Sequence, residues 1–167
     1  MLHIKMSAKQ IHVILLITLF GFCSTPTTFA QSTVYFFMGK IANSTCIMKL
    51  NGKEAFELRG PLQKTISPAP PMQYPYNVYS PCTKKCTFKN EGKMLFSVDM
   101  QFTNATSGVV SKMAGEIQLN LAEGSVYYVK VTNKGLHDVQ FKEITQKEAD
   151  KLLKNKKYVC LPEYIEE

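Results

Sequence analysis

Strict alternation of apolar and polar residues is the feature that most restricts how this chain can fold. In MLFSVDMQF, from Met94 to Phe102, every second residue is apolar, and Ser97, Asp99 and Gln101 lie between them. A period of two places the two sets on opposite faces of a strand, whereas a helix needs a period near 3.6. The pattern recurs in EIQLNL and in VYYVKVT. The chain is therefore predicted to be mainly β, with strands that each bury one face.

In the last of these segments the alternation separates two neighbouring tyrosines. Tyr127 falls on the inward face with Val129 and Val131, so we expect it in the core. Tyr128 falls on the outward face and is the member of the pair available for contact, unless a helix covers it. Glu123-Gly124 and Asn51-Gly52 are turn signals that predict hairpins on either side of the central strands.

The periodicity changes near the end of the chain. After a final predicted strand, DVQFKEI, Thr145 and Glu148 have the spacing of a capping box, and one apolar stripe follows. This predicts a single short C-terminal helix at about 145–155. The tail after the helix is expected to be ordered as far as Cys160.

The first 30 residues are typical of an export signal. Lys5 and Lys9 precede the apolar run Ile11–Phe22, and small residues stand at both positions that signal peptidase inspects, before Gln31. The run is shorter than the roughly twenty residues of a membrane span. We therefore expect cleavage before Gln31, with no membrane anchor. The remaining 31–167 is long enough for a single domain.

Four cysteines follow the predicted cleavage site, and an even number in a small exported domain predicts disulfides. Cys82 and Cys86, in CTKKC, suit a tight local loop, which would pair Cys46 with Cys160. Three connectivities are possible. The alternative is that these residues are free thiols that pack as small hydrophobic side chains.

The segment 59–86 interrupts the β pattern. Six prolines lie between Pro61 and Pro81, and proline is poorly tolerated inside central strands. We expect a long, partly extended loop, and such loops are often functional. Tyrosine supplies a large amphipathic contact area, so the candidate ligand-binding residues are Tyr74, Tyr76, Tyr79 and Met72. The alternative is a variable insertion that has no partner.

The order of elements resembles the DUF2846 family, a group of small exported bacterial β-domains without an established activity. The similar stretches are VYFF, CIMKLNGKEAFEL, IQLNLAEGSVYYVKV and DVQFKEITQKEADKLL, which cover most of 33–153. The family signature G-x-x-YYV-x-V is matched from Gly124 to Val131, whereas the Pro/Tyr-rich segment departs from the family. The resemblance implies an antiparallel β-sandwich of about seven to eight strands, Ig-like or prealbumin-like. It implies no catalytic residues.

Catalytic and metal-binding patterns are weak in this sequence. His137 is the one histidine after the predicted signal, so a Ser–His or Cys–His pair would have to use it. The carboxylates Asp99, Glu116 and Glu123 are scattered, and C-x-x-x-C with distant partners is a poor match to a zinc site. Phosphate-binding and nucleotide-binding motifs are not found. A single arginine, Arg59, among dispersed lysines argues against nucleic acid as a partner.

These observations together predict a non-enzymatic domain of a bacterium, periplasmic or extracellular, that needs no cofactor or metal. Its expected role is an interaction module that binds another envelope or extracellular protein, with a glycan as the second choice. The alternatives are a structural envelope domain without a specific ligand and a small hydrolase.

Overall fold

The computed structural model describes residues 31–42, 44–67, 69, 74–104, 106–134 and 138–166. The predicted export signal, Met72 and His137 lie outside these ranges. Among the described residues, no helix is both long and apolar enough to span a membrane.

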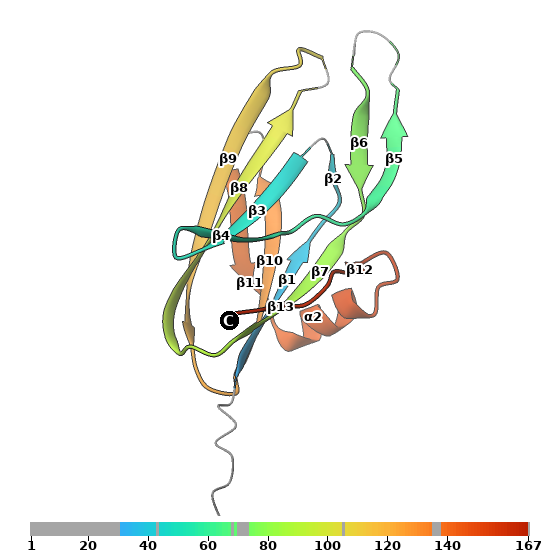
Figure 1. Cartoon of the computed structure of the whole chain (residues 1–167). Helices are drawn as coiled ribbons and strands as arrows, with labels where there is room; N and C mark the ends of the chain where they lie inside the picture. The colour runs from blue at the N-terminus through green and yellow to red at the C-terminus, as the bar shows by residue number, and fades with distance from the viewer. Residues whose placement is uncertain are drawn as a thin grey trace, which may run out of the picture.

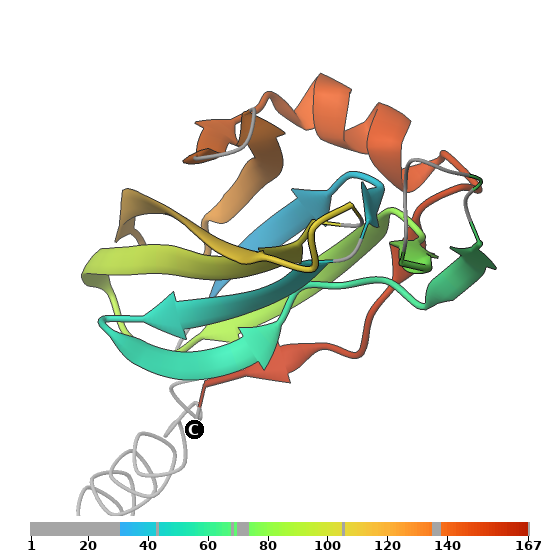
Figure 2. The same ribbon diagram turned by 90° about the horizontal axis from the view of Figure 1, so that it is seen from above.

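A curled sheet of ten strands forms most of the molecule (Figures 1 and 2). Its order begins at one edge with the C-terminal strand β12 and ends with β4, while β13 pairs with β7 beside β12. The strands in spatial order are β12 (Val159–Cys160), β7 (Cys82–Phe88), β1 (Ser32–Met38), β10 (Val126–Lys134), β11 (Asp138–Glu143), β9 (Val110–Leu121), β8 (Gly92–Thr103), β3 (Ser44–Leu50) and β4 (Lys53–Glu57), with β13 at Tyr164–Ile165.

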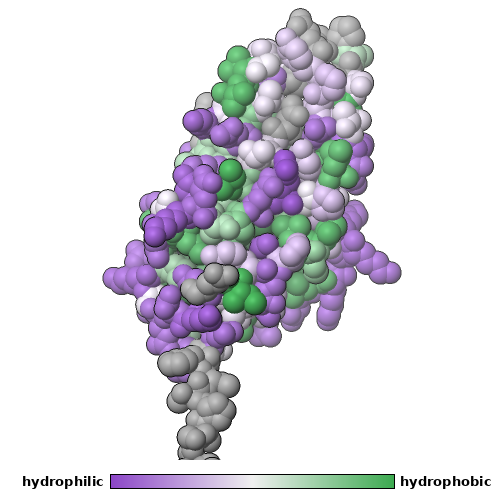
Figure 3. Space-filling view, in the orientation of Figure 1, coloured by the Kyte–Doolittle hydropathy of each residue, from purple (hydrophilic) through white to green (hydrophobic). Residues whose placement is uncertain are grey.

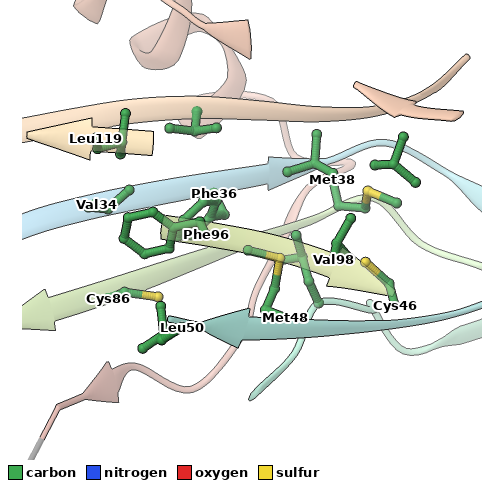
Figure 4. Packing of buried hydrophobic residues seen from close by; sticks show 14 of the residues in the cluster. Val34, Phe36, Met38, Cys46, Met48, Leu50, Cys86, Phe96, Val98 and Leu119 are labelled. Atoms are coloured by element: carbon green, nitrogen blue, oxygen red, sulfur yellow. The ribbon is translucent and has the colours of Figure 1, made fainter. Parts of the chain in front are cut away.

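The predicted alternation is confirmed along β8. Met94, Phe96, Val98 and Met100 are all buried, and β8 pairs with β9 over its whole length, from Gly92 opposite Leu121 to Thr103 opposite Val110. Phe96 lies at the centre of the core, where its ring is 5.2 Å from that of Phe36 and 5.5 Å from that of Phe88 (Figure 4). The core therefore fills the inside of the curl.

Side chains close the gap between the two ends of the curled sheet. Tyr164 of β13 packs 5.0 Å from Phe56 of β4 and 6.2 Å from Phe88 of β7, measured between ring centres. Seen from above, β4 and β13 lie along the same side of the molecule (Figure 2). The tail thus continues past Cys160, where the sequence predicted its order to end, because Tyr164 has a place in the core.

Helix α2 (Gln146–Leu153) lies on the outside of the sheet, over β1 and β10 (Figure 2). The predicted capping box is confirmed, since Thr145 accepts from the Glu148 backbone N–H and the Glu148 carboxylate accepts from that of Thr145. Tyr128 stacks on Tyr35 at 5.6 Å between ring centres. Burial, followed by the charge of Asp150, raises the pKa of Tyr128. Tyr128 is half-buried, on the side of the sheet where Asp150 of the helix lies near enough to affect it.

Tyr127 packs against the core, as the alternation predicted, and also fixes the turn before it. Its hydroxyl donates to the Asn120 carbonyl at 2.7 Å and accepts from the Ala122 N–H at 3.0 Å. The tyrosine pair is thus structural, with one ring on each side of the sheet.

The fold is mainly β with a single helix among the described residues, as predicted, but the sheet is mixed rather than purely antiparallel. The pairs β1–β10 and β9–β11 are parallel, and so are those that β12 and β13 make with β7. The tail and β1 return to strands that are distant in sequence, and turn signals do not report such pairings.

The expected long loop at 59–86 is corrected by the structure. It contains β5 (Leu62–Ile66) and β6 (Tyr76–Tyr79), and these form a second sheet with β2 (Ile41–Ala42) in the order β2-β6-β5. The start of β7 also lies in this segment. Its described prolines, Pro61, Pro75 and Pro81, each lie directly before a strand, and proline is compatible with β structure at such boundaries.

Candidate interaction surface

The β5–β6 hairpin projects beyond the main sheet, beside the tip of the β8–β9 hairpin (Figure 1). Arg59 fixes the base of this hairpin. Its guanidinium lies 4.6 Å from the centre of the Tyr79 ring, and its Nε lies 2.9 Å from the Glu57 carboxylate. Tyr79 also packs against the core. Tyr79 therefore anchors the β5–β6 hairpin to the main sheet, and this position does not support a role in contact with a ligand.

Tyr74, at the outer end of the β5–β6 hairpin, contacts the main sheet. A side-chain Cβ built at Gly108, in the β8–β9 turn, would lie 3.5 Å from Tyr74 Cε2. The ring therefore lies against the glycine backbone. Gly108 has φ +69°, a conformation that favours glycine, and its N–H donates to the Asn104 carbonyl at 2.8 Å. This contact places Tyr74, just before β6, against the β8–β9 turn.

Exposed apolar side chains lie on both sides of the contact between Tyr74 and Gly108. Tyr74 is 48% exposed, Val109 58% and Val110 55%. Hydrophobic atoms are visible at the upper end of the molecule, over the tip of the β8–β9 hairpin (Figure 3). We call Tyr74, Gly108, Val109 and Val110 the apical surface. Exposed apolar residues that lie close along two neighbouring hairpins make this the candidate contact site of the described residues.

Of the residues predicted to bind a ligand, only Tyr74 belongs to the apical surface. Tyr76 is half-buried opposite Ile66, Tyr79 is an anchor, and Met72 lies outside the described residues. Sequence reasoning missed Val109 and Val110. The signal that could have found them is two consecutive valines directly after the turn TSG, where alternation would bury at most one of them.

The apical surface lacks carboxylates in its surroundings. The sequence has no Asp or Glu in 58–90 or in 100–115, the segments that contain both hairpins, whereas Lys64 and Lys112 are exposed there. Asp99 and Asp138 both pair with Ala114, four residues along β9 from Val110, which is about 13 Å in a strand. Asp99 is also bonded to Lys49. This end of the molecule is therefore apolar and cationic.

Two hollows lie on the outer face of the sheet, below the apical surface. The larger, of 440 Å³, is lined by Thr45, Ile47, Glu54, Ala55, Phe56, Glu57 and Gln101. The smaller, of 270 Å³, shares Gln101 and lies between β8 and β9. Glu54 and Glu57 are exposed, and Glu57 is held by Arg59. Within the described ranges, no group of three or more His, Cys, Asp or Glu side chains could hold a metal ion.

The four cysteines are free thiols in the structure, and the predicted Cys82–Cys86 bridge does not fit the fold. Both residues lie in β7, and four residues of strand span about 13 Å, whereas a disulfide needs Cα atoms about 4.4–6.8 Å apart. Cys46 is buried in the core and Cys160 is exposed on β12. Burial raises the pKa of Cys82 to about 12 and raises those of Cys46 and Cys86 as well. These three thiols act as small hydrophobic side chains.

Comparison with known proteins gives no relative for this chain. No protein-family model, no curated protein and no solved structure matches it.

Proposed function

We propose that this chain is an exported, non-enzymatic interaction module that contacts a component of the cell envelope through its apical surface. The observation that carries the proposal is the contact between Tyr74 and Gly108, which brings exposed Tyr74 beside the turn that precedes exposed Val109 and Val110. Envelope proteins, glycans and lipids are all within reach of such a surface. A tyrosine-rich segment without tryptophan favours protein over glycan.

The finer assignments stay predictions. These are membership of the DUF2846 family, a sandwich of the Ig-like or prealbumin-like type, cleavage before Gln31 and a periplasmic or extracellular location. The shape of the curl, with a core enclosed between its two sides, is compatible with a sandwich. The apical surface does not depend on any of them.

Co-sedimentation with envelope fragments from the producing cells tests the proposal. The purified chain should sediment with the fragments, and the double variant Val109→Asp/Val110→Asp should lose at least nine-tenths of that binding. Val126→Asp is the matched control, because Val126 is 49% exposed and lies at the far end of β10, away from the apical surface.

Equal sedimentation of the two variants would contradict the proposal. It would favour the alternative, a structural envelope domain whose hairpin tips have no specific partner. Circular dichroism and the Tm of each variant would show that loss of binding does not come from unfolding.

A further inference from the structure

We infer that the apical surface docks onto the interface of an anionic lipid bilayer. This inference rests on the proposed function, because it names the partner of the same surface. It differs from a membrane anchor, since the contact involves a few side chains at the tips of two hairpins and is reversible.

The shape of the surface favours a bilayer over a folded protein. Tyr74 and Val109 are exposed in the connections between strands, and Val110 is exposed at the start of β9, so all three stand on projecting hairpins. A rigid protein would need a matching concavity for each tip, but a bilayer interface deforms around them. Tyrosine prefers the level of the lipid headgroups, because its ring is apolar and its hydroxyl is polar.

The charge of the surface favours anionic lipid. The hairpins have no carboxylate in 58–90 or 100–115, while Lys64 and Lys112 are exposed. Lysines near a membrane surface are attracted to acidic headgroups within about a Debye length, which is about 8 Å at physiological ionic strength. Asp138 pairs with Ala114, about 13 Å along β9 from Val110, so its repulsion at the tip is screened. Asp99 lines the same hollow as Lys112, but it is paired with Lys49, which offsets its charge.

The spacing along β9 suits shallow insertion. Lys112 lies two residues after Val110, about 7 Å along the strand. Apolar groups of interfacial proteins enter the headgroup boundary by about 5–10 Å. With the two valines at that depth, the Lys112 ammonium reaches the phosphate level. The two valines would therefore contact the apolar layer of the interface while Lys112 contacts the lipid phosphates.

Vesicle sedimentation with the full chain tests the inference. The probe is a set of vesicles of phosphatidylcholine with one quarter phosphatidylglycerol, compared with pure phosphatidylcholine. We expect saturable binding to the anionic vesicles that Val109→Asp/Val110→Asp lowers at least tenfold and Val126→Asp leaves unchanged. Lys112→Gln should lower it about fivefold, with no effect on the neutral vesicles. Lys64→Gln should lower it less, because Lys64 lies opposite Val78, about 13 Å along the hairpin from Tyr74.

The outcomes separate this inference from the proposed function. Binding to envelope fragments without binding to anionic vesicles would overturn the lipid inference and leave a protein or glycan as the partner. Loss of binding to both would overturn the two proposals together. Vesicle binding that Val126→Asp weakens as much as the apical double variant would also overturn the inference, because the contact would then lie elsewhere.

Discussion

Replacing Gly115 by alanine tests how closely the two strands β9 and β11 approach each other. A Cβ at position 115 would overlap the carbonyl oxygen of Val139 and would lie 2.9 Å from its carbonyl carbon and 3.1 Å from its Cβ. Val139 is only 6% exposed and belongs to the core. The backbone of β11 would have to move away from β9, because a carbonyl carbon cannot turn aside as a flexible side chain can.

The expected loss of stability follows from the cost of overpacking. Added carbon atoms in a packed core typically destabilise a protein by about 1–3 kcal/mol. A domain of about 135 residues has an unfolding entropy near 0.3 kcal/mol/K, at about 2.1 cal/mol/K per residue. Gly115→Ala should therefore lower Tm by about 4–10 °C in a thermal unfolding experiment.

Gly39→Ala provides the matched control. A Cβ at Gly39 would have no atom within 4 Å, and its backbone does not have a positive φ. The control should change Tm by less than about 2 °C, with a small gain expected from the restricted unfolded chain. If the two variants had the same Tm, the close parallel approach of β9 and β11 would be wrong.

Three further changes probe the tail and the thiols. Tyr164→Ala should lower the free energy of unfolding in urea by about 2–4 kcal/mol, because it removes the ring that closes the curl, whereas the adjacent and exposed Ile165→Ala should change it by less than about 0.5 kcal/mol. Glu163→Gln should flatten the acid branch of a Tm–pH profile. A hydrogen bond from Thr87, and next the interaction with Lys85, lower the pKa of Glu163 from 4.5, so its stabilisation is present above that value and is lost as the pH falls through the lower folded pKa. A thiol reagent at pH 8 should label Cys160 within minutes and the three core cysteines only on unfolding, and rapid labelling of all four would contradict their burial.

Alternation made the local structure predictable. In β8 and β10 the predicted inward residues are buried or, for Phe102 and Tyr127, half-buried against the core, because a period of two allows a single buried face. The helix was equally predictable, because the capping hydrogen bonds between Thr145 and Glu148 form within one turn. Both signals are contained in fewer than about fifteen consecutive residues, so no tertiary contact is needed to interpret them.

Long-range pairings could not be predicted in the same way. The parallel register of β1 with β10 places Thr33 opposite Val126. The residues next to each of them in sequence carry no signal of this pairing. The prolines of 59–86 concealed β5 and β6, because Pro61 and Pro75 each stand directly before a strand and the short strands themselves are weak in pattern. Pattern reasoning identifies which residues face inward but not which strand lies beside them.

The candidate site was predicted in part. Tyr74 was identified from composition, but its position depends on Gly108, thirty-four residues away, which offers a backbone without a side chain. Tyr79 was predicted as a contact residue because it belongs to the same tyrosine-rich segment. Its contact with Arg59 shows that composition alone does not separate contact residues from anchoring ones. An exposed tyrosine and an anchoring tyrosine look alike until the tertiary neighbours of each are known.

Hydrogen–deuterium exchange of the unmodified chain, with and without envelope fragments, tests the location of the contact most directly. We predict slower exchange in peptides that cover 104–112 and 74–79, and unchanged exchange across the distant turn at 121–127. Protection at 121–127 or over helix α2, with none at the two hairpin tips, would contradict the apical surface as the site of contact.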